Sequence, residues 1–217
     1  MAFGRFAVCA GEADAIMPKL CVPRFANHLL SIPLSLQVLW AVSGLILTVI
    51  STFLQPAILI PQTSGTVMLQ SIDTTFQVGA VLFTACMGGR NAAVISQFAY
   101  VLLGLVGLNV FYQGGGMGYM RSPAFGYLVG FIIGGAVCGH LAMSRPRSVE
   151  NLTFSCLVGL AVIHGVGALL ILVRSFPDFP LILSYLQQYS LYPLGGQLLV
   201  AGTVVFVATI MRLFLFY

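Results

Sequence analysis

Charged side chains are too few in this chain to cover the surface of a water-soluble protein. The 217 residues include nine Lys and Arg and five Asp and Glu, and 59% of all residues are hydrophobic. An average soluble domain has about one charged residue in four, which keeps its surface hydrated. The composition therefore excludes a soluble globular fold and predicts an integral membrane protein.

Long apolar stretches divide the chain into candidate membrane spans. A helix needs about 20 mostly apolar residues to cross the hydrocarbon core of a bilayer. Six stretches approach this length, and they predict an all-α bundle of six transmembrane helices, at residues 33–60, 75–89, 91–108, 124–143, 152–173 and 193–216. Residues 1–32 are expected to form a cytoplasmic leader, and residues 33–217 to form the membrane domain.

Two glycine patterns predict how these helices connect and pack. The run GGRN at residues 88–91 is typical of a tight turn, so the second and third spans are expected to form an antiparallel pair. On the fourth span, Gly126, Gly130 and Gly134 recur every four residues. This spacing is typical of helices whose backbones approach closely within lipid.

The Lys and Arg residues predict the orientation, because cytoplasmic loops retain more positive charge than outer loops. With the amino terminus inside, Arg121 and Arg174 fall on the outer side. The other seven cations fall on the inner side: Arg5, Lys19, Arg24, Arg90, Arg145, Arg147 and Arg212. Both termini are therefore predicted to be cytoplasmic, and the protein is expected in the cell membrane.

Four polar side chains fall at the outer ends of the predicted spans. Gln77 begins the second span and Asn109 ends the third, while Tyr127 opens the fourth. Gln197 opens the sixth. An amide buried without a partner is costly, so each of these groups requires another helix or a ligand. Interhelical hydrogen bonds would explain any one of them, whereas four at one level favour a binding pocket.

The connection between the third and fourth predicted spans is rich in glycine. It reads NVFYQGGGMGYMRSPAFG over residues 109–126. Its glycines permit backbone shapes that other residues rarely adopt, and they are Gly114, Gly115, Gly116 and Gly118. The segment lacks the GxxxxGK pattern of a phosphate-binding loop. We interpret it as a lid over an outward-facing ligand site, and the alternative is a flexible linker.

The side chains of this connection suit a small organic acid. Phe111 and Tyr112 offer flat apolar surfaces, and Gln113 offers both a hydrogen-bond donor and an acceptor. Arg121 can hold a carboxylate with two parallel hydrogen bonds. These residues are therefore predicted to contact the ligand together with the polar groups at the span ends.

Patterns typical of catalysis or metal binding are missing from the sequence. It contains no paired carboxylates within the spans, no Ser/His/Asp order and no HExxH, so we expect neither catalytic residues nor a cofactor. The five cysteines are scattered without a CxxC pair, and we interpret them as buried apolar residues rather than metal ligands. No basic stripe suits nucleic acid. A membrane-embedded enzyme that uses His164 and Arg174 is the alternative from another class.

A family pattern covers the most distinctive part of the chain. Residues 100–131 read YVLLGLVGLNVFYQGGGMGYMRSPAFGYLVGF. This stretch resembles the biotin-specific substrate-binding component of energy-coupling-factor transporters, whose pattern is approximately YLLLGxxGLPVFxxGxGG followed by GPTGGYLxGF. Residues 75–90 are similar to the second-span pattern of that family, TLQTLAVxLAGLLLGPR, and the resemblance extends over residues 34–217.

The resemblance implies a six-helix component that binds biotin from outside with high affinity and catalyses nothing itself. The loop at residues 61–72 and the glycine-rich connection would close over the ligand. A coupling membrane subunit and two ATPase subunits would then drive uptake. These partners and the ligand are implied by the resemblance alone.

The sequence departs from the family pattern at residues 122–126, where SPAFG replaces GPTGG, and at three single positions. Asn109 replaces a proline, and Gln197 and Val200 stand where the family has Asp and Lys. Gln197 can still hydrogen-bond a ureido group, but Val200 cannot bind a carboxylate. The acid group of biotin would then depend on Arg121, and another small carboxylate-bearing vitamin is the alternative ligand.

Overall fold

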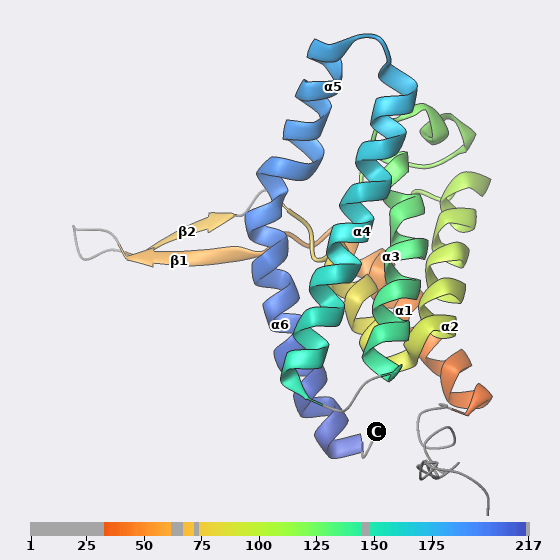
Figure 1. Cartoon of the computed structure of the whole chain (residues 1–217), viewed down its shortest axis with the longest axis vertical. Coiled ribbons are helices and arrows are strands. Elements are labelled where there is room, and N and C mark those ends of the chain that lie inside the picture. The colour runs from red at the N-terminus through yellow and green to blue at the C-terminus, as the bar shows by residue number, and fades with distance from the viewer. Residues whose placement is uncertain (1–32, 62–66, 72–73, 145–147, 216–217) are drawn as a thin grey trace, which may run out of the picture.

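The chain folds into a bundle of long helices with a small two-stranded sheet at its side (Figure 1). The computed structural model describes residues 33–61, 67–71, 74–144 and 148–215, so the predicted leader lies outside the described residues. Five of its helices are long and apolar enough to cross a membrane: Leu34–Thr52, Gln77–Val106, Phe125–Ser144, Val149–Ser175 and the continuous run Phe179–Leu215. The prediction of a helical integral membrane protein is confirmed at this level.

The first helix is shorter than predicted and is followed by a β-hairpin. Helix α1 (Leu34–Thr52) ends before Pro56, which cannot continue a helix. Strand β1 (Ala57–Pro61) then pairs antiparallel with β2 (Val67–Ser71). The structure therefore corrects the predicted end of the first span at residue 60, and adds a hairpin, which projects away from the bundle, to the helical fold (Figure 1).

Helix α2 (Gln77–Val106) is a helical hairpin rather than one straight rod. Gly89 leaves helical geometry with φ 76° and ψ −171°, a conformation that favours glycine. Gln77 Nε2 donates a hydrogen bond to Tyr100 Oη over 3.0 Å, although the two residues are 23 positions apart. A straight helix would separate them by about 35 Å. The chain therefore reverses at Gly89, and the predicted antiparallel pair is confirmed.

Helices α3 (Phe125–Ser144) and α4 (Val149–Ser175) pack with their backbones close together. A Cβ atom at Gly130 would lie 2.8 Å from Ile163 O, and a Cβ at Gly134 would meet the backbone of α4 in the same way. Only glycine allows this approach. The glycine spacing of the fourth predicted span thus marks its contact with α4, as expected for helices packing in lipid.

The last helical run begins well before the predicted sixth span. Helix α5 (Phe179–Leu186) starts at the N-cap Asp178 and continues through a π-helical turn, η3 (Gln187–Leu191), into α6 (Tyr192–Leu215). The structure therefore corrects the predicted start at residue 193. A π-helical turn has i→i+5 hydrogen bonds, which make the helix wider there, and it is often found at functional sites.

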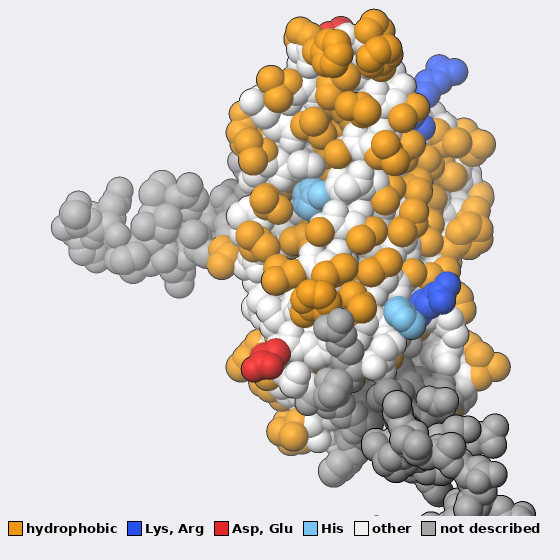
Figure 2. Space-filling model, in the orientation of Figure 1, with side chains coloured by type: hydrophobic (Ala, Val, Ile, Leu, Met, Phe, Trp, Pro, Cys, Tyr) orange, Lys and Arg blue, Asp and Glu red, His pale blue; other side chains and the backbone are white. Residues whose placement is uncertain are grey.

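Hydrophobic side chains are spread over the whole visible face of the bundle (Figure 2). Large apolar residues are exposed on the long helices, from Leu34 on α1 to Leu213 on α6. The middle of this face shows no Lys, Arg, Asp or Glu (Figure 2). A water-exposed protein would not leave such a wide apolar surface uncovered, so this region is suited to contact with lipid.

Gly130→Ala is expected to destabilise the protein, because its methyl group would press on the backbone of Ile163. Overpacking of this kind costs about 1–3 kcal/mol. Gly165→Ala is the matched control, since nothing lies within 4 Å of a Cβ atom there. Thermal unfolding in detergent, followed by circular dichroism, should show a lower Tm for Gly130→Ala only. Equal Tm values for both variants would contradict the close contact.

Candidate functional site

A cavity of about 330 Å³ lies where the ends of α2, α3 and α6 meet the glycine-rich loop. Cavities of this size hold small organic molecules. The described residues that line it carry no formal charge, and they are Gln55, Thr74, Thr75, Gln77, Val78, Tyr112, Gln113, Tyr119, Ala124, Tyr127, Leu128, Phe131, Ile163, Gln188, Tyr189, Pro193 and Gln197. The cavity is therefore polar and aromatic rather than charged.

Five of the eight predicted ligand-binding side chains line this cavity. They are Gln77, Tyr112, Gln113, Tyr127 and Gln197. These residues come from the start of α2, the glycine-rich loop, the start of α3 and the first turns of α6. The fold thus brings them together at one end of the bundle from positions far apart in the sequence.

The other three predicted side chains do not line the cavity. Phe111 is only 1% exposed, and its ring packs on Tyr119 with the ring centroids 4.5 Å apart. Asn109 is exposed in the loop, and Arg121 is exposed at the end of the short 3-10 helix η2 (Met117–Arg121). Their contacts with a ligand stay predictions.

The glycine-rich loop folds back on the end of α2. Gly114 and Gly116 have φ angles of 105° and 99°, which favour glycine. Gly116 N donates a hydrogen bond to Gly104 O over 2.7 Å. A Cβ atom at Gly115 would collide with backbone oxygens of the preceding turn, whereas Gly118 faces open space. Three of these glycines are therefore required by the folded shape of the loop itself.

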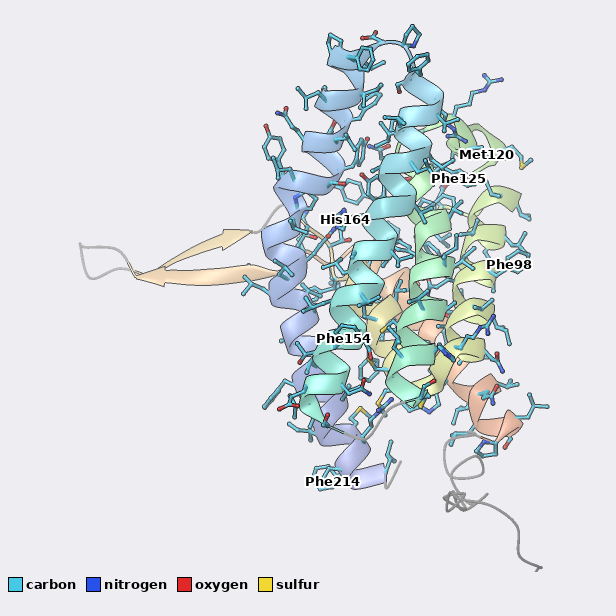
Figure 3. The ribbon with its side chains drawn as sticks, viewed as in Figure 1. Phe98, Met120, Phe125, Phe154, His164 and Phe214 are labelled. Carbon is cyan, nitrogen blue, oxygen red and sulfur yellow. The ribbon has the colours of Figure 1, made fainter. Side chains whose placement is uncertain are left out.

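Arg174 holds the far end of this loop against α4. Its Nη1 donates hydrogen bonds to Met120 O over 2.6 Å and to Ser122 O over 3.5 Å. The guanidinium also lies over the Phe125 ring, 5.7 Å from its centroid. Figure 3 shows Met120 and Phe125 together at the loop end of the bundle. The backbone on both sides of Arg121 is thus fixed in place.

Tyr119 lines the cavity from η2. Burial raises the pKa of its phenol above the usual value, and nearby Tyr189 adds to the shift. The phenol therefore keeps its proton at neutral pH and can donate a hydrogen bond to a ligand. Tyr189 and Tyr127 lie close by, with ring centroids 6.0 Å apart, and add aromatic surface.

The amide of Gln77 offers an acceptor to the cavity. Tyr100 Oη donates a hydrogen bond to Val110 O over 2.9 Å, so it accepts the hydrogen bond from Gln77 Nε2. The amide orientation follows from this network. Its Nε2 group is turned toward Tyr100, and Oε1 is the atom left for a ligand.

The amide of Gln197 offers a hydrogen-bond donor to the cavity, whereas that of Gln77 offers an acceptor. Its Oε1 lies 2.6 Å from His164 Nε2, so the ring proton is assigned to Nε2. His164 Nδ1 then accepts from Ser190 Oγ over 3.0 Å, and Ser190 Oγ lies 2.6 Å from Tyr127 Oη. With Oε1 engaged, the Gln197 Nε2 group is left as a donor toward the cavity.

His164 reaches the cavity only through Gln197, because neither His164 nor Ser190 is among the described lining residues. His164 lies on α4, on the side toward α6 (Figure 3). In the sequence it stands out only as an ionisable group in an apolar span. Its hydrogen-bond partners are 26 and 33 residues away in the sequence.

The π-helical turn that carries Gln188 and Tyr189 is likewise not indicated by any sequence pattern.

Comparison with known proteins places these features in a family. The profile of the BioY family matches residues 27–215. A Cyanophora paradoxa protein, described as an uncharacterized 21.2 kDa protein in the psbX-ycf33 intergenic region, is 30% identical over 167 residues, which cover 76% of this chain and 88% of the relative.

Two bacterial relatives carry a transporter name. The probable biotin transporter BioY of Lysinibacillus sphaericus is 39% identical over 102 residues, covering 46% of this chain and 51% of the relative. The biotin transporter BioY of Thermotoga maritima is 36% identical over 100 residues, covering 46% and 59%. The chain thus aligns with a little over half of each of these two proteins.

One solved structure has a similar fold. It is the crystal structure of the S-component for biotin from an ECF-type ABC transporter. The TM-score is 0.60 and the sequence identity 21%, over 84% of this chain and 95% of that chain. At this identity the likeness concerns the fold alone.

Phe111→Ala is expected to destabilise the ligand-free protein by about 3–5 kcal/mol, because the Phe111 ring is a buried core side chain. Tyr112→Ala is the matched control, since Tyr112 is the next residue and is 60% exposed. Unfolding by denaturant in detergent measures the difference. Equal stability of Phe111→Ala and Tyr112→Ala would contradict the role of the Phe111 ring in the core.

Proposed function

The chain belongs to the BioY family, and we propose that it binds biotin at the outer face of the cell membrane. It would act there as the substrate-binding component of an energy-coupling-factor transporter. One observation carries the choice of ligand: the cavity offers an amide acceptor from Gln77 and an amide donor from Gln197.

The ureido ring of biotin matches this pair of amides. Its carbonyl oxygen accepts hydrogen bonds, and its two N–H groups donate them. Gln197 Nε2 would donate to the carbonyl oxygen, while Gln77 Oε1 would accept from an N–H group. The aromatic rings of Tyr119, Tyr127 and Tyr189 would cover the apolar part of the bicyclic ring system.

We propose that the carboxylate of biotin binds Arg121. Tyr119 lines the cavity two residues before it, so the guanidinium lies on a segment that already faces the site. Tyr112 and Gln113 would contact the chain that joins the ring system to the carboxylate. Phe111 supports Tyr119 from behind, and Asn109 remains a proposed contact of the glycine-rich loop.

We further propose six membrane crossings with both termini in the cytoplasm. The two arms of α2 run antiparallel on either side of Gly89, and each would cross separately. Arg90 and Arg212 lie near the end of the bundle that holds this reversal, whereas Arg121 and Arg174 lie at the cavity end. These four cations divide evenly, so the excess comes from the cations that precede α1 or stand between α3 and α4 in the sequence: Arg5, Lys19, Arg24, Arg145 and Arg147. By this excess of positive charge inside, the cavity end would face outward and residues 1–32 would form a cytoplasmic leader.

The partners in this proposal are a coupling membrane subunit and two ATPase subunits, and the chain itself catalyses nothing.

Gly44 and Thr48 of α1 are buried and face α2. A Cβ atom at Gly44 would collide with the side chain of Thr84, and Gln97 Nε2 donates a hydrogen bond to Thr48 Oγ1. The coupling subunit would therefore contact the opposite, apolar face of α1. That face includes Leu39, Val42 and Ile46.

Purified protein should bind radiolabelled biotin, and Gln197→Leu should weaken binding by about 1–3 kcal/mol, because the ureido oxygen loses its donor. Leu198→Ala is the control, since Leu198 is exposed and does not line the cavity. Unlabelled nicotinate and pantothenate test the alternative of another carboxylate-bearing vitamin. Displacement by one of these, with no binding of biotin, would reject the proposed ligand.

Arg121→Ala should weaken binding of biotin by about 1.5–3 kcal/mol, the range for a hydrogen bond to a charged group. Binding of biotinamide, which lacks the carboxylate, should not change. Arg90→Ala at the other end of the bundle controls for loss of net charge. An equal loss of affinity for biotin and biotinamide would show that Arg121 shapes the loop and does not bind the acid group.

A further inference from the structure

Three cysteines meet in the core at the end of the bundle opposite the cavity. Cys86 lies on α2, Cys138 on α3 and Cys156 on α4. Cys86 Sγ is 3.9 Å from Cys138 Sγ and 3.5 Å from Cys156 Sγ, and all three sulfurs lie within 4.8 Å of one another. Each side chain is at most 1% exposed. The sulfurs are therefore neighbours in three dimensions, although the sequence separates them by 18 residues or more.

The spacing of the sulfurs fits one metal ion at their centre. A thiolate binds a first-row metal ion at about 2.3 Å. Three sulfurs placed evenly around such an ion lie about 4 Å apart, by the geometry of an equilateral triangle. The observed distances between the sulfurs would reach this value if the side chains moved by a fraction of an ångström.

A positive charge lies beside the three cysteines. Arg212 is buried, and its guanidinium donates to Cys86 O, with Nε at 3.1 Å, and to Ala142 O over 3.2 Å. It also approaches Met143 Sδ at 3.5 Å. A cation next to a thiol favours the deprotonated form, which is the form that binds metals. The site therefore has a built-in counter-charge for thiolates.

The kind and number of donors select the metal. Thiolates favour soft ions such as Cu(I), and also Zn(II). Structural zinc sites almost always have four protein ligands. Within the part of the chain that the structure describes, no fourth His, Cys, Asp or Glu joins the group. Three sulfur donors without a fourth ligand favour Cu(I).

We propose that Cys86, Cys138 and Cys156 bind one Cu(I) ion between α2, α3 and α4. All three thiols lose their protons on binding, because the thiolate is the form that binds the metal. Three thiolates and Cu(I) together carry a formal charge of −2, and the neighbouring Arg212 guanidinium lowers the cost of burying it. The ion would join the three helices at the end of the bundle where α2 reverses.

The test uses the full chain with Cys9 and Cys21 replaced by Ser, since those two thiols could also bind copper. Under anaerobic conditions this protein is titrated with Cu(I) in competition with bathocuproine disulfonate. We expect one Cu(I) per chain, about three protons released per ion, and a higher Tm when the ion is bound. Retention of no copper by this protein would overturn the proposal.

Cys138→Ala and Cys156→Ala, each made in the same background, should lower the affinity for Cu(I) at least about tenfold. Unchanged affinity in either variant would remove that sulfur from the site. X-ray absorption of the copper-loaded parent protein tests the site without any core substitution, so it remains decisive where a variant fails to fold. Three sulfurs at about 2.3 Å support the proposal. Nitrogen or oxygen ligands, or a preference for Zn(II) over Cu(I), would reject it.

Discussion

A polar group inside a membrane protein has no bulk water to bond to, and this constraint shapes the cavity. Two amides in its wall take a partner from the protein, and in each of them the other polar atom stays available to a ligand. Tyr100 engages the nitrogen of Gln77, and His164 engages the oxygen of Gln197. The protein partners therefore decide which amide accepts and which donates, before any ligand arrives. A glutamine that could rotate freely would give no such preference.

The placement of the two amides depends on how closely the helices pack. The reversal at Gly89 brings Gln77 level with Tyr100, so the first arm of α2 presents its amino-terminal end to the cavity. Gly139 on α3 allows this turn to lie close, because a Cβ there would be 2.6 Å from backbone atoms of the turn. Glycine thus acts here by bringing backbones together. The polar site at one end of the bundle rests on close packing at the other end.

Much of this fold could be predicted from local patterns. The turn at residues 88–91 and the glycine ridge on α3 are each encoded within a few residues, and the structure bears them out. The apolar stretches predicted long membrane-capable helices, but not where the first one ends or the last one begins. The hairpin after α1 and the π-helical turn η3 could not be predicted, because they interrupt stretches whose composition suits a simple helix or loop. The network from Tyr127 through His164 to Gln197 could not be predicted either, since its members come from three helices. Polar residues at span ends indicated a pocket, but only the fold shows that Arg121 lies outside its wall.

The uncharged cavity wall and the exposed position of Arg121 have a common explanation. A guanidinium buried in an empty, lipid-surrounded cavity would lose its hydration without gaining a counter-ion, which costs several kcal/mol. On an exposed loop the same group stays hydrated, so the ligand-free state carries no such cost. Arg174 fixes the loop backbone at Met120 and Ser122, and the Arg121 side chain can therefore move without unfolding its support. In the site that we propose, a neutral wall would hold the ring system of the ligand and an exposed guanidinium would bind its acid group.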